Sequence, residues 1–280
     1  MAGPSLSEGA NTAFPPCRSE AEHQAAEADL ADLVRQLMAG SPGIDKSAAE
    51  HLRRCDRCSA VFLALTGMLT VEMVDRLEQA LVDPGAVDGA PLHQWAHLWR
   101  LNMACSERQS NATATAASLA VLGMLHRCSG QRSASVRGGT DSAYEDAAFL
   151  HRRALRLSRG LADAWPAVHS HADLALLALD RGHSDEALFH LEKAARALDK
   201  LPEGPHKAAM SHRLQGVGGR ISQATAQAAA VVAGMPQSPM VARAPASAAA
   251  HRLHLFLNAL RRPAPLYAAG EDPIDGVSAQ

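Results

Sequence analysis

An HxxxCxxC run formed by His51, Cys55 and Cys58 constrains this chain more than any other feature of its sequence. Zn²⁺ prefers imidazole and thiolate ligands in a tetrahedral shell, so these three residues supply most of a structural zinc site. In a continuous helix all three share one face, because residues three, four and seven apart point the same way. A turn at positions 56–57 would instead form a knuckle of two thiolates, with the imidazole reaching in from the preceding helix. Either arrangement brings the three donors together.

A closed site needs a fourth ligand, and His23 and Cys17 are the upstream candidates. A helix is predicted from about Ala21 to Met38, since apolar residues recur there at helical spacing. The turn at 41–43 and a capping box of Ser47 and Glu50 then begin a second helix just before the run. Two antiparallel helices place the start of the first near the ligands, which favours His23. Cys17, in an arm that could fold in, is the substitute.

Arginines surround the two cysteines of the run, at Arg53, Arg54 and Arg57. Nearby cations lower the pKa of a thiol, so the sequence predicts thiolates ready to bind a metal. Two alternatives stay open at this stage. One is a structural thiol pair without metal, and the other is a chance spacing in an alanine-rich helix, where cysteine packs as a small apolar residue.

The stretch from about His23 to Leu69 resembles the zinc-binding anti-sigma factor family, whose mark is an upstream His or Cys followed by an HxxxCxxC run. The apolar residues 61–63 fit this pattern too. The resemblance implies a small helical zinc domain with His51, Cys55, Cys58 and, more approximately, His23 as ligands, and a sigma factor as partner. The family commonly has an acidic Leu-Asp-Gly-Glu turn where this chain has residues 38–43, MAGSPG, so a different protein partner is the open alternative.

The composition predicts an all-α protein and limits its partners. Hydrophobic residues make up 47% of the 280 positions, largely as alanine and leucine, with only 4% aromatic residues. The net charge of -2 gives no basic field for nucleic acid or anionic membrane. No run approaches the ~18 uninterrupted apolar residues of a membrane span, and no signal peptide is recognisable. We therefore expect a cytoplasmic protein with reduced thiols.

The positions of proline and glycine residues predict how the chain is divided into segments. We expect a small zinc-binding domain followed by a helical bundle or repeat-like region, with a loop at 129–140. The predicted segments are a disordered arm (1–18), the zinc-binding domain (19–82), a helical region similar to tetratricopeptide repeats (91–233), a linker (234–250), a short helix (251–262) and a disordered tail (263–280).

Residues 144–201 carry the likeness to tetratricopeptide repeats. Gly182 stands where such a repeat has its tight turn, and Ala187 and Ala194 stand where it needs small residues. The segment 145–154 aligns with 185–194 at an offset of 40. A generic pair of amphipathic helices is the alternative interpretation.

No catalytic motif accompanies the metal ligands. A hydrolytic zinc site needs an open coordination position and a general base, and the adjacent glutamate, Glu50, is predicted to cap a helix. We therefore expect no enzyme. The leading hypothesis is a cytoplasmic zinc-binding regulator that sequesters a sigma factor through its N-terminal helices. The alternative is a helical-repeat adaptor in which zinc is purely structural.

Overall fold

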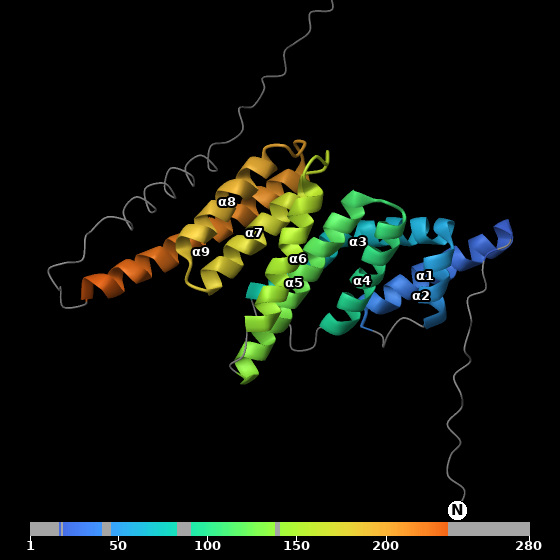
Figure 1. The fold of residues 1–280 in the computed structure, drawn as a ribbon, viewed down its shortest axis with the longest axis horizontal. Coiled ribbons are helices and arrows are strands. Elements are labelled where there is room, and N and C mark those ends of the chain that lie inside the picture. Colours follow the sequence, from blue (N-terminus) through green and yellow to red (C-terminus); the bar gives the residue numbers. More distant parts are fainter. Residues whose placement is uncertain (1–16, 18, 41–45, 83–90, 138–140, 235–280) are drawn as a thin grey trace, which may run out of the picture.

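The computed structural model describes residues 17, 19–40, 46–82, 91–137 and 141–234, and all its regular structure is helical, as predicted (Figure 1). The helices of this part of the chain are α1 (Glu20–Met38), α2 (Lys46–Arg54), α3 (Asp56–Val82), α4 (Leu92–Arg108), α5 (Ala112–Arg137), α6 (Asp141–Ser158), α7 (Trp165–Asp180), α8 (Ser184–Leu198) and α9 (Pro205–Gly234). The predicted arm at 1–18, apart from Cys17, and the linker, short helix and tail beyond Gly234 lie outside the described residues.

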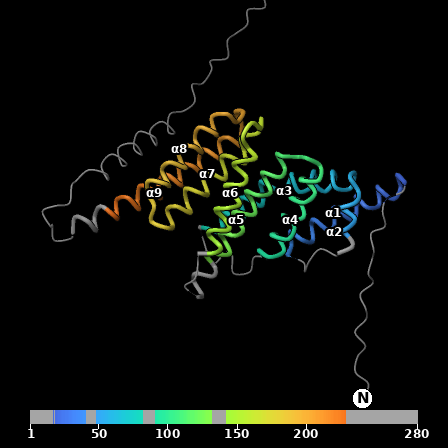
Figure 2. Tube along the Cα trace, viewed as in Figure 1, coloured from blue at the N-terminus to red at the C-terminus, as the bar shows by residue number. Residues whose placement is uncertain are grey.

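The helices succeed one another along the long axis of the molecule (Figures 1 and 2). α1 and α2 lie at one end, and α8 and α9 at the other. Between them α3 packs on α1, α4 and α5, so it joins the N-terminal helices to the rest. One cluster of buried side chains runs from Ala26 in α1 to Ile221 in α9. The N-terminal helices therefore share their core with the C-terminal ones.

The first helix follows the sequence prediction closely. α1 begins at Glu20, one residue before the predicted start, and ends at Met38. The Ser19 side chain accepts a hydrogen bond from the Glu22 amide at 3.2 Å, which satisfies one of the free N–H groups at a helix start. At its other end, the Trp95 indole of α4 donates to the Met38 carbonyl at 3.2 Å. The capping box at Ser47 lies outside the side chains that the structure describes.

α3 is the one helix in the described ranges that is long and apolar enough to cross a membrane by length and composition, over Asp56–Leu81 with a mean hydropathy of 1.5. Polar and charged residues interrupt its apolar sequence. Phe62, Met73 and Leu77 are fully buried in the helical core, although only 33% of the apolar window is buried. A core helix of a soluble protein passes the same composition test, so the finding is weak evidence of a membrane span.

The predicted loop at 129–140 is wrong over its first part, because α5 continues to Arg137. Gly130 therefore lies inside a helix, and a Cβ there would meet the Tyr144 ring of α6 at 2.9 Å. Gly123 lies about two helical turns before Gly130. A Cβ on Gly123 would lie 2.5 Å from Nε2 of His151. These glycines let the backbone of α5 approach α6, so their role is in packing. In the sequence alone, glycines at such positions indicate a loop.

Gly182 makes the tight turn that the repeat pattern predicted. Its φ of +78° is in the left-handed region, where glycine carries no Cβ penalty. The His183 amide donates to the Ala178 carbonyl at 2.8 Å and the Gly182 amide to Leu179 at 2.9 Å. This pair of bonds is a Schellman motif, which ends α7 and turns the chain back into α8.

The offset of 40 residues seen in the sequence also relates two helices in space. Residues 145–157 of α6 and 185–197 of α8 share the same pattern of buried, half-buried and exposed positions, except at Arg152 and Glu192. Ala147 and Ala154 are fully buried, and so are their equivalents Ala187 and Ala194. The two helices thus occupy equivalent environments, each packed against α7.

Candidate metal centre

The candidate ligands come from the points where the first three helices meet. Cys17 precedes the cap of α1, and His51 lies in the last turn of α2. Cys55 occupies the single non-helical residue between α2 and α3, and Cys58 lies in the first turn of α3. The chain therefore breaks at Cys55, one residue before the turn considered from sequence. The Cys55 amide still donates to the His51 carbonyl at 2.9 Å, which holds the break in a helical geometry.

One donor atom from each of Cys17, His51, Cys55 and Cys58 lies within 4.8 Å of all the others. The Cys17 sulfur is 3.5 Å from the Cys58 sulfur and 3.6 Å from Nε2 of His51. A tetrahedral zinc with Zn–S bonds of 2.3 Å separates its sulfur ligands by about 3.8 Å. Three sulfurs and one imidazole at these separations fit a closed tetrahedral site, and the donor set is the one that zinc prefers.

His23 lies against the same group of donors. Its Nδ1 atom is 3.5 Å from the Cys58 sulfur and 3.9 Å from the Cys55 sulfur. The prediction of His23 as the fourth ligand is not tested by these distances, because a tetrahedral site takes four of the five donors present. The closest group of four contains Cys17, the residue that sequence analysis kept as substitute.

The arginine-rich sequence predicted lowered thiol pKa values, but those of Cys17 and Cys58 are raised. Burial raises the pKa of Cys58, and the neighbouring Cys55 and Cys17 thiols raise it further. Burial likewise raises the pKa of Cys17. The arginines are engaged by carboxylates instead: Arg57 pairs with Glu20 at 2.5 Å and Arg54 with Glu50 at 2.6 Å.

Burial that raises the pKa of the Cys17 and Cys58 thiols makes a cation beside them favourable for their thiolate forms. Ionising several of them at once in water-poor surroundings is costly without a positive charge beside them. A metal cation removes this cost and binds the thiolates directly. The Glu50 carboxylate pairs with Arg54 at 2.6 Å.

Side chains from α4 fix the start of α3 beside the site. Arg108 pairs with the Asp56 carboxylate at 2.7 Å, and the Gln109 amide donates to the Asp56 carbonyl at 3.0 Å. Arg108 also donates to the Arg53 carbonyl at the end of α2. The ligand-bearing ends of α2 and α3 are therefore held together from outside as well as by the donors.

A second polar cluster, which sequence analysis missed, lies inside the C-terminal helices. Arg127 of α5 is fully buried and pairs with Asp173 of α7 at 3.5 Å and Asp180 at 2.9 Å. Arg213 of α9 pairs with Asp173 at 3.3 Å and with Glu78 of α3 at 2.6 Å. Lone charges inside the apolar runs of α5 and α7 were the only signal in the sequence.

Histidines line the same interior. His169 contacts Arg213, whereas His171 lies 3.1 Å from His190 between their Nδ1 atoms. Burial lowers the pKa of His171 to about 4, and that of fully buried His151 to about 4 as well. These imidazoles are therefore neutral at physiological pH and serve as polar packing groups.

No family model, curated protein or solved structure matches this chain.

Proposed function

We propose that the chain is a zinc-binding regulator of the anti-sigma type, which sequesters a sigma factor through its N-terminal helices. The observation that carries the proposal is the convergence of Cys17, His51, Cys55 and Cys58 within 4.8 Å at the junction of α1, α2 and α3. Zinc there would be structural, because four protein donors close its shell and leave no position for a substrate. Binding of a partner, rather than catalysis, is the function that such a module supports.

An exposed apolar stripe on α3 supports the partner-binding part of the proposal. The Met68 and Val71 side chains are 72% and 47% exposed, and the exposed residues Ala60 and Ala64 continue the stripe toward the metal ligands. Apolar side chains gathered on one helix face are typical of a surface that another helix covers. The partner would then lie on the helix that the zinc site orients.

Purification of the full-length chain from its native cell tests the partner. We expect a sigma factor to co-purify, and we expect the double variant Met68→Glu/Val71→Glu to lose it. Both positions are exposed, so the variant should fold as well as the parent chain. Phe149→Glu/Phe189→Glu is the matched control, since it places two charges on exposed apolar positions of α6 and α8. Absence of any sigma factor from the parent preparation would refute the anti-sigma assignment.

Cobalt substitution tests the metal and its fourth ligand together. Sulfur-to-cobalt charge-transfer bands are expected for the parent chain, and their loss in the Cys55→Ala variant. Cys17→Ala and His23→Ala then distinguish the two candidates, because only the true ligand should lower the metal content measured by elemental analysis. A parent chain without charge-transfer bands would remove the basis of the proposal.

The second candidate function is a helical-repeat adaptor, and one observation favours it. α6 and α8 repeat the same burial pattern at an offset of 40 residues, as stacked repeat units do. In this case the zinc site would only stabilise one end. A partner lost from the Phe149→Glu/Phe189→Glu variant, but retained by the α3 variant, would favour the adaptor over the anti-sigma assignment.

A further inference from the structure

The outer surfaces of α6 and α8 repeat each other residue by residue. The equivalence at an offset of 40 was expected for buried alanines, which packing selects. It extends to exposed positions, where packing selects nothing. Both helices carry two acidic residues, then a phenylalanine, then a basic residue and an arginine: Glu145, Asp146, Phe149, Arg153 and Arg156 in α6, and Asp185, Glu186, Phe189, Lys193 and Arg196 in α8. We call this set the phenylalanine face.

The two phenylalanines are the unexplained part of this face. Phe149 is 57% and Phe189 52% exposed, although the core of both helices is filled by other side chains. Lys193 lies over the Phe189 ring at 5.4 Å, and the edge of that ring meets His190. A large exposed aromatic side chain is unfavourable in water, so its presence twice at equivalent sites indicates a surface that another molecule covers.

α6 and α8 both lie against α7 and do not contact each other. Both pack on α7, and tight connections reverse the chain at each end of α7, so α6 and α8 run in the same direction. Arg152 of α6 is close enough to His190 of α8 to lower the pKa of that imidazole. The face therefore has one acidic edge, a central pair of phenylalanine rings and one basic edge.

This distribution of charge selects the occupant. Acidic residues at helix starts and basic residues at helix ends also complement the helix macrodipole, but that effect does not require exposed rings between them. A surface with opposite charges at its two edges is complementary to a second copy of itself when the two-fold axis lies in the contact plane, across the helices. An isologous two-fold contact is the commonest form of protein self-association.

We propose that the phenylalanine face binds a second copy of the chain in a two-fold dimer. The axis lies in the contact plane and crosses α6 and α8 at the level of the two phenylalanines, so each copy sets its acidic edge on the basic edge of the other. Phe149 of one copy then meets Phe149 of the second, and Phe189 meets Phe189.

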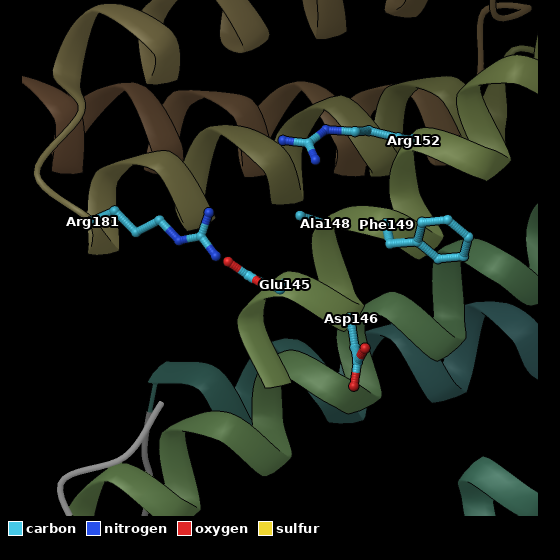
Figure 3. Close-up of a pocket in the computed structure, with 6 residues that line it drawn as sticks. All are labelled: Glu145, Asp146, Ala148, Phe149, Arg152 and Arg181. Atoms are coloured by element: carbon cyan, nitrogen blue, oxygen red, sulfur yellow. The ribbon is translucent and has the colours of Figure 1, made fainter. Parts of the chain in front are cut away.

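A hollow beside Phe149 gives the second copy's ring a place to insert. It has a volume of about 470 Å³ and lies between α6 and the end of α7 (Figure 3). Glu145, Asp146 and Phe149 border it on α6, and Arg181 reaches in from the turn after α7. The Arg181 side chain points toward Glu145, so the hollow is polar at its rim and aromatic at one edge.

Sedimentation velocity of the full-length, metal-loaded chain over a range of concentrations tests the dimer. We expect a species of twice the 29.5 kDa chain mass that dissociates on dilution. The variant Phe149→Asp/Phe189→Asp should weaken association by about tenfold or more, since buried aromatic anchors dominate such contacts. Met68→Asp/Val71→Asp, which alters the exposed stripe of α3 instead, should leave the dimer intact. Unchanged circular dichroism establishes that the variants fold.

Charge exchange tests the two-fold arrangement itself. Replacing the four acidic residues by lysine (Glu145→Lys/Asp146→Lys/Asp185→Lys/Glu186→Lys) makes both edges basic. Replacing the four basic residues by glutamate (Arg153→Glu/Arg156→Glu/Lys193→Glu/Arg196→Glu) makes both acidic. Each variant alone should be monomeric, and an equimolar mixture should form a mixed dimer. A parent chain that stays monomeric at its highest soluble concentration would overturn the proposal. Loss of a different protein from the phenylalanine variants of a monomeric chain would overturn it too and assign the face to that partner.

Discussion

The two ends of this molecule bury polar groups by different means. At the α1–α3 end, the thiols of Cys17, Cys55 and Cys58 gather around His51, and burial raises the pKa of Cys17 and Cys58. In the C-terminal helices, buried Arg127 meets carboxylates of α7 at 2.9–3.5 Å. The second cluster balances its charge from within the chain. The first cluster gathers thiols and an imidazole that could hold a metal, so a bound cation would supply its counter-charge from outside the chain.

Removal of the metal is the largest perturbation that this contrast predicts. Structural zinc supplies on the order of 10 kcal/mol in small domains, so Cys58→Ala or a strong chelator should unfold α1 and α2. Circular dichroism should show a partial loss of helix, with the C-terminal helices retained. Cys105→Ala is the control, because Cys105 is buried outside the donor group. Unchanged helicity after chelation, with no zinc by elemental analysis, would break the comparison.

Removal of Arg127 is the corresponding test at the other end. The Arg127→Met variant leaves Asp173 buried with one fewer cation, which we expect to lower the free energy of unfolding by about 3–5 kcal/mol. Urea denaturation measures this loss, and a chelator should not alter it. Arg220→Met is the control: Arg220 also pairs with Asp180, at 3.4 Å, but its side chain is 45% exposed, so a loss of about 0–1 kcal/mol is expected. Equal losses in both variants would contradict a buried ionic cluster.

Close packing of α5 on α6 should respond to a single methyl group. A Cβ on Gly123 would lie 2.5 Å from Nε2 of His151, so Gly123→Ala should cost about 1–3 kcal/mol through overpacking. Gly216→Ala should have the opposite effect, because nothing lies within 4 Å of its added Cβ. This variant should raise the free energy of unfolding by about 0.5–1 kcal/mol through a more stable α9. Urea midpoints measure both. A neutral effect of Gly123→Ala would show that the C-terminal core is looser than described.

The buried imidazole of His151 predicts the smallest effect, on pH dependence. Burial lowers its pKa from 6.5 to about 4, against the Asp173 charge, while Arg127, Arg213 and His190 lower it further. Between these values the unfolded chain binds a proton that the folded chain does not. Its contribution to the free energy of unfolding therefore falls with decreasing pH by about 1.4 kcal/mol per pH unit.

The His151→Asn variant should lose this contribution. Between pH 5 and 6.5, its free energy of unfolding should change less steeply with pH than that of the parent chain. The difference in slope should be about 1.4 kcal/mol per pH unit. His183→Asn is the surface control, since its side chain is 62% exposed. Parallel pH profiles of the parent chain and His151→Asn would contradict a neutral, buried imidazole.

Local sequence signals predicted the first region better than the second. The limits of α1, the grouping of His51 with the two downstream cysteines and the turn at Gly182 all follow from patterns within a few residues. Such patterns report helical faces and turns directly. The choice between Cys17 and His23 could not follow from them, because it depends on how the chain before α1 lies against α2 and α3.

The buried ionic cluster could not be predicted because its members are remote in sequence. Glu78, Arg127, Asp173 and Arg213 come from α3, α5, α7 and α9, and only tertiary packing brings them together. Gly130 was misread for a related reason. A glycine that allows a neighbouring ring to approach looks, in the sequence alone, the same as a glycine that breaks a helix.

α3 carries the candidate ligand Cys58 in its first turn and Glu78, a member of the ionic cluster, near its last turn. The helix between them is unbroken. Cys58 and Glu78 are separated by about 30 Å of helix axis, so a rotation of about 5° at the thiol would shift the carboxylate by about 2.6 Å. A displacement of that size would break the contact between Glu78 and Arg213, which is itself 2.6 Å long. Any change at Cys58 that tilts α3 would therefore also disturb the packing of α9 at the other end of the molecule.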